Sequence, residues 1–256
     1  MSSLATLYIF QTNVSGTLPS SWKHFVAVSD LHLRNMLVGP LPESWSQMVS
    51  LQNLRLDHNN LNSSLPNSWA ALQQVTAILL DSNFITGTLP SSWSTMTSLQ
   101  QLTLSSNSIG GMLPSSWTNL RSLTQLQISD NRLVGSLPPA WVSIPSLQQL
   151  YLQNNCLTGT MPTFSNARLQ LPSAINVCNT KIRGSGPNVS RCPGYQWPHY
   201  CNDMVSQTRS DSEVRASATW SGPLTSPTMS NTVTHSSSNE SLSLSRLSSA
   251  TVWCLL

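Results

Sequence analysis

The stretch Leu89–Gly111, LPSSWSTMTSLQQLTLSSNSIGG, contains two phrases that return along most of the chain. The first phrase, Leu-Pro-x-Ser-Trp with small variations, places one tryptophan in each copy. Successive tryptophans are separated by 23, 24, 24, 24 and 24 residues. A fixed period with fixed phrases indicates one small structural unit that is repeated along the chain. The six tryptophans are Trp22, Trp45, Trp69, Trp93, Trp117 and Trp141.

The second phrase, as in Leu99–Gly111, alternates apolar and polar residues before it reaches an asparagine. If each unit is numbered from its Leu-Pro, positions 14 and 16 are Leu or Ile and position 19 is Asn. The two-residue alternation predicts a short strand with both apolar side chains on one face. Strands of neighbouring units then lie side by side as a parallel sheet. Positions 13, 15, 17 and 18 are expected on its concave, solvent-facing side.

The asparagine position is expected to lie in the turn after the strand. A buried carboxamide there can bind backbone groups of its own turn and of the next turn, so that the asparagines stack into a ladder. An apolar replacement leaves those groups unpaired, at a cost of about 1–3 kcal/mol each. Leu-x-x-Leu-x-Leu-x-x-Asn-x-Leu is the signature of the leucine-rich repeat. The asparagines are Asn59, Asn83, Asn107, Asn131 and Asn155.

Three other positions of the unit have a physical interpretation. Position 23 is mostly Gly, which permits a backbone conformation that a Cβ penalises. The Pro at position 2 has a preset φ and no N–H, which suits the start of a helical turn. The Trp at position 5 is expected to close the core on the convex side, because burying an indole removes roughly 150–250 Å² from water.

The repeats predict an α/β fold, a leucine-rich-repeat solenoid with a concave parallel β-sheet, over residues 1–164. Residues 165–201 are expected to form a cysteine-containing cap, because an open solenoid end exposes its core. Residues 202–256 are rich in Ser and Thr and are expected to form a disordered tail. Two disulfides are predicted in and beside the cap, with their pairing left open. Their cysteines are Cys156, Cys178, Cys192 and Cys201.

The chain opens inside a unit, because Met1 falls on the position that Met48 and Met96 occupy in other units. We therefore expect a longer protein or a truncated gene. The sequence shows no signal peptide at Met1 and no run of the roughly 18–20 apolar residues that spans a bilayer. Membrane association is thus expected only through an anchor that is not visible in this chain.

Units of 24 residues with a G-x-L-P element resemble the plant-type leucine-rich repeats of receptor ectodomains. The Leu-Pro-x-Ser-Trp form, as in Leu41–Trp45 and Leu89–Trp93, more closely resembles the promastigote surface antigen family of kinetoplastid parasites. That resemblance is strong over residues 1–160, loose over 161–201 and compositional beyond. It implies a glycosylated cell-surface protein for adhesion or host interaction. The missing signal peptide and anchor are departures from the family.

Composition and motifs argue against two broad functions. Charged residues make up 8% of the chain and the net charge is +3, so no basic stripe for nucleic acid can be built. The sequence contains no G-x-S-x-G, H-E-x-x-H or P-loop motif, and its five histidines are scattered. We expect no enzyme activity, no catalytic residues and no cofactor. A metal site at Cys192, His199 and Cys201 is disfavoured because no tight C-x-x-C pair is present.

The concave positions predict a binding surface for a protein or glycan ligand. In the N-terminal units they combine aromatic rings with charges, the chemistry of binding hot spots. A merely solvated sheet face is the alternative. The predicted ligand-binding residues are Tyr8, Phe10, His32, Arg34, Arg55, Asp57, His58 and, in the last unit, Tyr151.

Glycosylation sequons and the cysteines favour the secretory route, and hence a cell-surface or extracellular location. Three alternatives remain open: an intracellular leucine-rich-repeat scaffold, an ectodomain fragment of a receptor kinase, and a decaying gene copy without function. The predicted glycosylation sites are Asn13, Asn62, Asn188 and Asn239.

Overall fold

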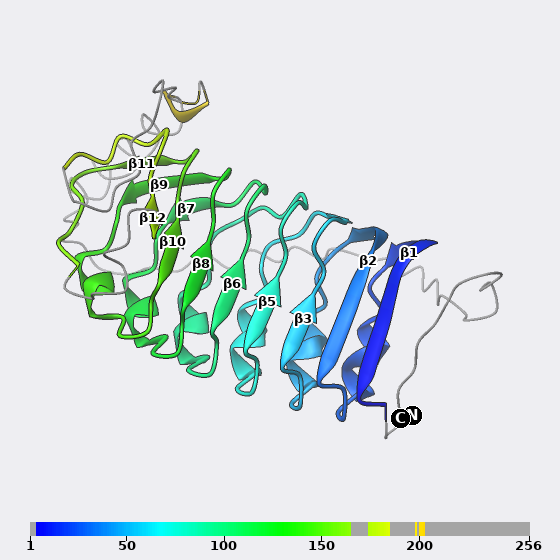
Figure 1. Cartoon of the computed structure of the whole chain (residues 1–256). Coiled ribbons are helices and arrows are strands. Elements are labelled where there is room, and N and C mark those ends of the chain that lie inside the picture. Colours follow the sequence, from blue (N-terminus) through cyan, green and yellow to red (C-terminus); the bar gives the residue numbers. More distant parts are fainter. Residues whose placement is uncertain (1–3, 165–173, 185–197, 199, 203–256) are drawn as a thin grey trace, which may run out of the picture.

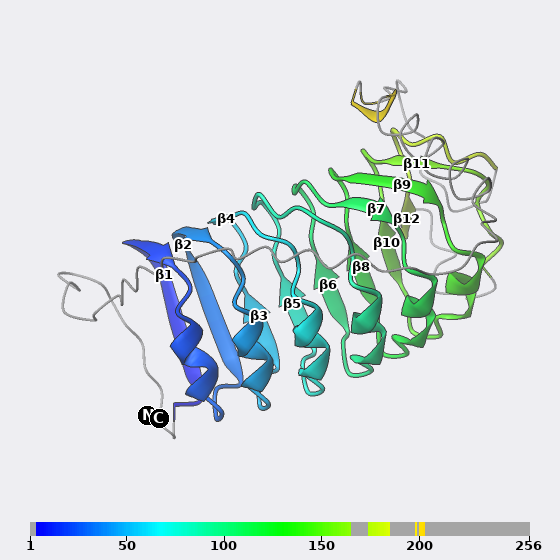
Figure 2. The same cartoon turned by 180° about the vertical axis from the view of Figure 1, so that it is seen from behind.

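The computed structural model describes residues 4–164, 174–184, 198 and 200–202. Each full unit coils once around a common interior, with a strand on one side and a short 3-10 helix on the opposite side (Figure 1). The same solenoid seen from behind presents the helices (Figure 2). The predicted leucine-rich-repeat solenoid with a concave parallel sheet is therefore confirmed.

The large sheet has nine strands, and every pairing within it is parallel. Eight of the strands follow one another in the order in which they occur along the chain, and β4 (Asn60–Leu61) pairs with one end of β2. The eight are β1 (Thr6–Thr17), β2 (Asp30–Gly39), β3 (Asn53–Arg55), β5 (Ala77–Leu79), β6 (Gln101–Thr103), β8 (Gln125–Gln127), β10 (Gln149–Tyr151) and β12 (Ile175–Asn176).

The alternation along each strand separates the core from the concave face. On β3, Leu54 is fully buried, whereas Asn53 is half-buried and Arg55 is exposed on the other side. The apolar residues at positions 14 and 16 are at most 2% exposed in all six full units, which confirms their predicted inward direction. They are Leu31, Leu33, Leu54, Leu56, Ile78, Leu80, Leu102, Leu104, Leu126, Ile128, Leu150 and Leu152.

The tryptophans stack along the convex side, as predicted. Five of them are fully buried, and Trp69 lies parallel to Trp45 and Trp93 with ring centroids 6.4 and 6.2 Å away. Trp22 is only half-buried, although it stacks on Trp45 at 5.9 Å. Each tryptophan lies in a 3-10 helix that begins directly after the Pro of its unit. The helices are η1 (Ser20–His24), η2 (Glu43–Gln47), η3 (Asn67–Ala71), η4 (Ser91–Thr95), η5 (Ser115–Asn119) and η6 (Pro139–Ser143).

The indole N–H groups form a ladder of their own, which the sequence analysis did not predict. The Nε1 of Trp69 donates to the carbonyl of Pro42, 2.9 Å away in the preceding unit. The same bond recurs at 2.9–3.0 Å for the other four fully buried tryptophans. Because a buried donor without a partner costs about 1–3 kcal/mol, the Pro carbonyl makes an indole tolerable in this core.

The asparagine ladder is present, but its direction corrects the prediction. The Oδ1 of Asn83 accepts the backbone N–H of Leu61 at 3.1 Å. Its Nδ2 donates to the carbonyls of Leu56 and Leu80 at 2.9 and 3.1 Å. Leu56 and Leu61 belong to the preceding unit, so the carboxamide binds its own turn and the turn before it rather than the next one. The direction in which the units stack decides whether the carboxamide binds the preceding or the next turn. The repeat pattern in the sequence does not specify that direction.

The first two strands are longer than the predicted short strands. β1 and β2 contain 12 and 10 residues. In later units the residue at position 18 has a positive φ, which ends the strand; His58 (56°) and Ser82 (54°) are examples. Apart from 11–13 and 35, no non-glycine residue of β1 or β2 has a positive φ, and these strands continue. The unit of β2 is one residue short, and its register with β1 shifts after Phe10.

A second, smaller sheet runs along one side of the solenoid, and it was not predicted. Its three strands pair in parallel, and Gly111 and Gly135 within it have φ values of 75° and 81°. The prediction that the glycines at position 23 adopt a backbone conformation that a Cβ penalises is thereby confirmed. The strands are β7 (Gly110–Met112), β9 (Arg132–Ser136) and β11 (Cys156–Thr158).

We predict that Gly111→Ala lowers the free energy of unfolding by about 1–2 kcal/mol, because left-handed backbone is costly for a residue with a Cβ. The new Cβ would also lie 2.8 Å from Cγ2 of Thr88. Gly110→Ala is the matched control, because Gly110 is not among the residues with positive φ. Chemical denaturation followed by circular dichroism measures both variants. Equal losses in the two would show that φ is not the reason for the glycine.

The predicted cap contributes one more turn to the solenoid. β12 pairs in parallel with β10, and Gly184 has a positive φ, as do the glycines at position 23 of the regular units. The sequence did not reveal this turn, because Thr180 stands near the place of the asparagine and Ile175 begins a strand of only two residues. Of the predicted tail, 202–256, all residues after Asn202 lie outside the described part of the chain.

Candidate functional site

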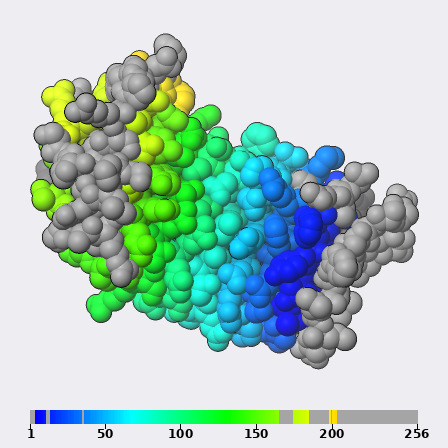
Figure 3. All heavy atoms as spheres, in the orientation of Figure 1, coloured from blue at the N-terminus to red at the C-terminus, as the bar shows by residue number. Residues whose placement is uncertain are grey.

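The register of the large sheet brings most of the predicted ligand-binding residues together on the concave face. Tyr8 of β1 pairs with His32 of β2, which pairs in turn with Arg55 of β3. Two residues further along the same strands, Phe10 pairs with Arg34. We call the group Tyr8, Phe10, His32, Arg34, Arg55, Asp57 and His58 the N-terminal patch. Figure 3 shows this side of the molecule, and the residue range of the patch runs there from dark blue to light blue.

Aromatic rings form the first half of the N-terminal patch. The Phe10 ring stacks on the His32 ring with centroids 5.7 Å apart, and Tyr8 meets His32 edge-on at 5.9 Å. Phe10 is nevertheless 41% exposed, whereas five of the repeated tryptophans are fully buried. The patch therefore presents apolar ring surface to solvent on a rigid sheet.

Charged groups form the second half, around Asp57. Its Oδ2 lies 2.9 Å from Nδ1 of His58 and 3.7 Å from Nε of Arg34, and both of those side chains are 51% exposed. Burial lowers the pKa of His32; Asp57 opposes this shift, while Arg55 and Arg34 reinforce it. His32 is therefore neutral at pH 7 and serves as a ring surface rather than as a cation.

Tyr151 does not belong to this patch. It lies on β10, and the strands β5, β6 and β8 separate it from β3. Between the two ends, the concave face is largely lined by amide and hydroxyl side chains. Ser129 donates to Ser105 at 3.0 Å, for example. The structure thus divides the predicted residues into one patch and a separate tyrosine.

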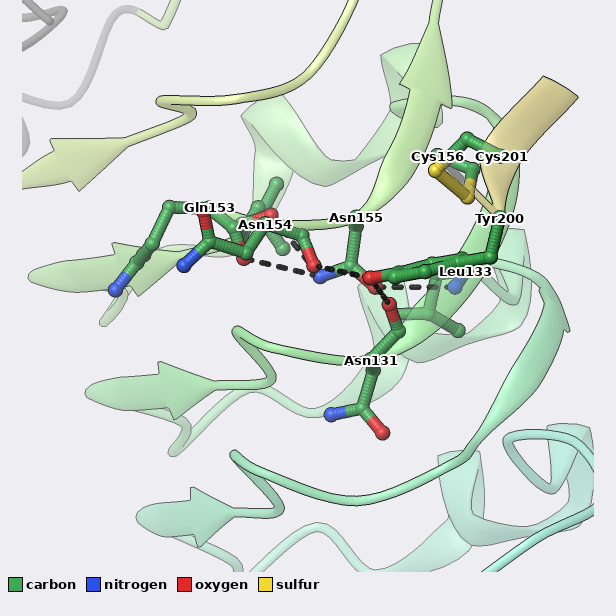
Figure 4. The surroundings of a disulfide bond; sticks show 9 residues. Asn131, Leu133, Gln153, Asn154, Asn155, Cys156, Tyr200 and Cys201 are labelled. Carbon is green, nitrogen blue, oxygen red and sulfur yellow. Dashed lines mark hydrogen bonds between the residues drawn. A yellow bond between two sulfur atoms is a disulfide. The ribbon is translucent and has the colours of Figure 1, made fainter. Parts of the chain in front are cut away.

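The C-terminal end of the solenoid is fastened by one of the predicted disulfides, whose pairing the sequence left open, and by contacts of Tyr200 that were not predicted (Figure 4). Cys156 of β11 forms a disulfide with Cys201. The hydroxyl of the neighbouring Tyr200 donates to the carbonyl of Asn131 at 3.1 Å, and its ring lies 6.0 Å from the Arg132 guanidinium. Burial and, to a smaller extent, the negative charge of Asp130 raise the pKa of Tyr200, so the phenol remains a donor at pH 7. The repeat pattern does not predict this contact, because Tyr200 and Asn131 are 69 residues apart.

The remaining predicted sites are placed in part. Cys178 is also disulfide-bonded, and Cys192 lies outside the described residues. Asn62 is exposed directly after β4, and Asn13 lies within β1. Asn188 and Asn239 lie outside the described residues. In the part of the chain that the structure describes, no three His, Cys, Asp or Glu side chains could together hold a metal ion. A helix with the length and hydropathy of a membrane span was likewise not found there.

The family comparison agrees with this architecture. A family model described as leucine rich repeat matches residues 73–133 and 97–157, and a second model of the same description matches 50–72. A comparison with curated proteins found no match.

Solved structures with the same fold include two plant receptors, each in complex with a second named molecule. The peptide hormone receptor RGFR1 bound to RGF2 is 27% identical, with a TM-score of 0.66 over 71% of this chain. The Arabidopsis thaliana receptor kinase GASSHO1/SCHENGEN3 bound to CASPARIAN STRIP INTEGRITY FACTOR 2 is 27% identical, with a TM-score of 0.62 over 70%. The aligned regions are only 29% and 23% of those two receptor chains.

A plant ice-binding protein is 22% identical, with a TM-score of 0.52 over 73% of this chain and 72% of its own, and this likeness concerns the fold alone. The core positions, the family models and the receptor structures therefore agree that this chain contains leucine-rich repeats, stacked as in the receptor ectodomains.

Proposed function

We propose that this chain is a non-enzymatic recognition module that holds a peptide or protein ligand on the concave face of its sheet. The observation that carries the proposal is the N-terminal patch. There, a solvent-exposed Phe10 ring stacks on His32 beside the Arg34–Asp57 pair.

The side chains of this surface are already held in a fixed arrangement before a ligand binds. Exposed aromatic rings and arginines are the side chains that most often dominate binding energy. The strands hold them in a fixed register, so little conformational entropy is lost when a ligand docks. Phe10 has no role in the core, yet its ring is held in place by His32. A merely solvated sheet face gives no reason for that arrangement.

The two receptor ectodomains at 27% identity support a peptide or protein ligand over a glycan. A glycan ligand is the alternative that a binding test must separate. The disulfide between Cys156 and Cys201 supports an extracellular location, because disulfides persist in oxidising compartments. We extend the proposal to N-glycosylation of Asn62, whose side chain is exposed.

Two kinds of whole protein fit this module. The receptor ectodomain likeness favours an ectodomain fragment of a receptor kinase. The Leu-Pro-x-Ser-Trp form of the unit favours a surface glycoprotein for adhesion, of the promastigote surface antigen type. Both place the module at a cell surface, and both leave ligand recognition to the concave face.

We predict that combining Tyr8→Ala, Arg34→Ala and Arg55→Ala weakens binding at least about 100-fold, because hot-spot truncations cost about 2 kcal/mol each. The probes are peptides selected from a random 12-residue phage library against the whole chain. Calorimetry measures their affinity, and a glycan array tests the alternative.

The matched control combines Lys23→Ala and Arg121→Ala, which remove two cations away from the concave face. Thermal unfolding should be unchanged within about 0.5 kcal/mol in both variants, because surface substitutions have small effects. Selected peptides that bind the triple variant as tightly as the wild type would refute the proposed ligand surface. Specific signals on the glycan array alone would replace a peptide ligand with a glycan.

A further inference from the structure

One strand of the concave face differs from its neighbours in having apolar side chains there. On β5, Ile78 points into the core and is fully buried, so Ala77 and Leu79 point to the concave side, where the small Ala77 side chain is itself only 7% exposed. Leu79 is only half-buried. The residues paired with these two on either side are polar: Asn53 and Arg55 on β3, Gln101 and Thr103 on β6.

A carboxylate stands at the end of this apolar strip. Asp81 follows Leu79 by two residues and so continues along the same side of the chain. Its Oδ1 accepts the backbone N–H of Ser105 at 2.8 Å, and its Oδ2 accepts the hydroxyl of Thr103. These two bonds to the next unit fix the direction of the carboxylate.

The Asp81 carboxylate has no cationic partner among the described residues. The ion pairs found among the described residues are those of Asp57 with Arg34 and with His58. Burial raises the pKa of Asp81, and its hydrogen bonds from Thr103 and Ser105 oppose this shift. A half-buried carboxylate in this setting gains more from an added cation than an exposed one does, because water screens it less.

An apolar strip that leads to a carboxylate matches a side chain with an aliphatic stem and a cationic head. We propose that Leu79 and Asp81 form a subsite for a Lys or Arg side chain of the ligand. The stem lies on Leu79 and the charged head meets Asp81. This inference rests on the proposed function, and it names the chemistry that the ligand carries. The cyan middle of the concave face, which contains β5, is open to view in Figure 3.

A purely structural role for Asp81, as a link between two units, is the competing explanation. Asp81→Asn separates the two roles. The amide retains an oxygen that accepts the Ser105 N–H, and the Thr103 hydroxyl can rotate to accept from the new NH₂ group. The variant should therefore fold as the wild type does, while the negative charge is lost.

The test uses the whole chain and the random 12-residue phage library. Peptides that bind the concave face should be enriched in Lys or Arg at one position. The affinity of a synthetic selected peptide should fall about tenfold or more in Asp81→Asn, because it loses a charge-assisted bond. Replacing the peptide's basic residue with norleucine should cause a similar loss. If Asp81 and the basic residue contact each other, Asp81→Asn and the norleucine peptide together should weaken binding little more than either change alone.

Asp30→Asn is the matched control. Asp30 is another half-buried carboxylate on this sheet, and it accepts Asn53 Nδ2 at 2.7 Å. Its variant should bind the peptide as the wild type does. Leu79→Ser should weaken binding of the basic peptide by losing the stem contact.

The failures of the two proposals can be told apart. A pool without specific binders, or binders that ignore the Tyr8, Arg34 and Arg55 substitutions, would overturn the proposed function and this inference with it. A pool that needs the N-terminal patch but lacks basic residues would overturn the subsite alone. So would an Asp81→Asn loss that is equally large for the norleucine peptide, because the effect would then be structural.

Discussion

Replacing Trp69 with Ala is expected to lower the free energy of unfolding by about 4 kcal/mol, the middle of the range for buried aromatic residues. The Trp69 side chain is fully buried, and its ring stacks on Trp45 and Trp93. Its truncation leaves a cavity and removes one of the two hydrogen bonds that the Pro42 carbonyl accepts, the other coming from the Trp45 backbone N–H. Because each repeat contacts only its neighbours, the change weakens the coupling on both of its sides.

Two comparison variants make this prediction specific. Trp69→Phe keeps a ring but removes the N–H, so it should cost less than the Ala variant. Trp22→Ala should also cost less, because Trp22 is only half-buried. Denaturant unfolding followed by tryptophan fluorescence and circular dichroism measures all three. If Trp22→Ala proved as damaging as Trp69→Ala, burial in the indole stack would not be what stabilises the solenoid.

Replacing Asn83 with Ala is expected to lower the free energy of unfolding by about 2–4 kcal/mol. The change removes the partner of the Leu61 N–H. It also removes one of the two carboxamide bonds that the Leu56 and Leu80 carbonyls each accept, whose other donors are Asn59 and Asn107. An unpaired buried N–H costs about 1–3 kcal/mol, each lost bond to a carbonyl adds about 0.5–1.5 kcal/mol, and water entering the small cavity recovers part of that cost.

Asn60→Ala is the control for this substitution, because Asn60 is an exposed asparagine one position after the ladder of its own unit. It should change stability by no more than about 0.5 kcal/mol. Hydrogen exchange at the Leu61 amide gives a local readout, and in Asn83→Ala it should be faster than in the control. Unchanged protection of that amide would show that the carboxamide is not its essential partner.

Much of the candidate site was predictable because the strand alternation fixes which side chains share a face. Tyr8, His32 and Arg55 occupy the same position in successive units, and a parallel register necessarily places them in a row. The contacts within the row were not predictable. The ion pairs that Asp57 forms with Arg34 and His58 depend on side-chain rotamers and on the local shift of β2.

The period alone settled the solenoid, its core leucines, its buried tryptophans and the glycines with positive φ, because each position of a repeated unit meets the same neighbours in every copy. Only the tertiary structure decided that Asn83 binds the preceding turn and that each buried indole finds a Pro carbonyl. It also decided that Cys156 pairs with Cys201 while Tyr200 reaches Asn131. Those bonds depend on how the units stack and on where a segment distant in sequence packs. A local sequence pattern specifies neither of these.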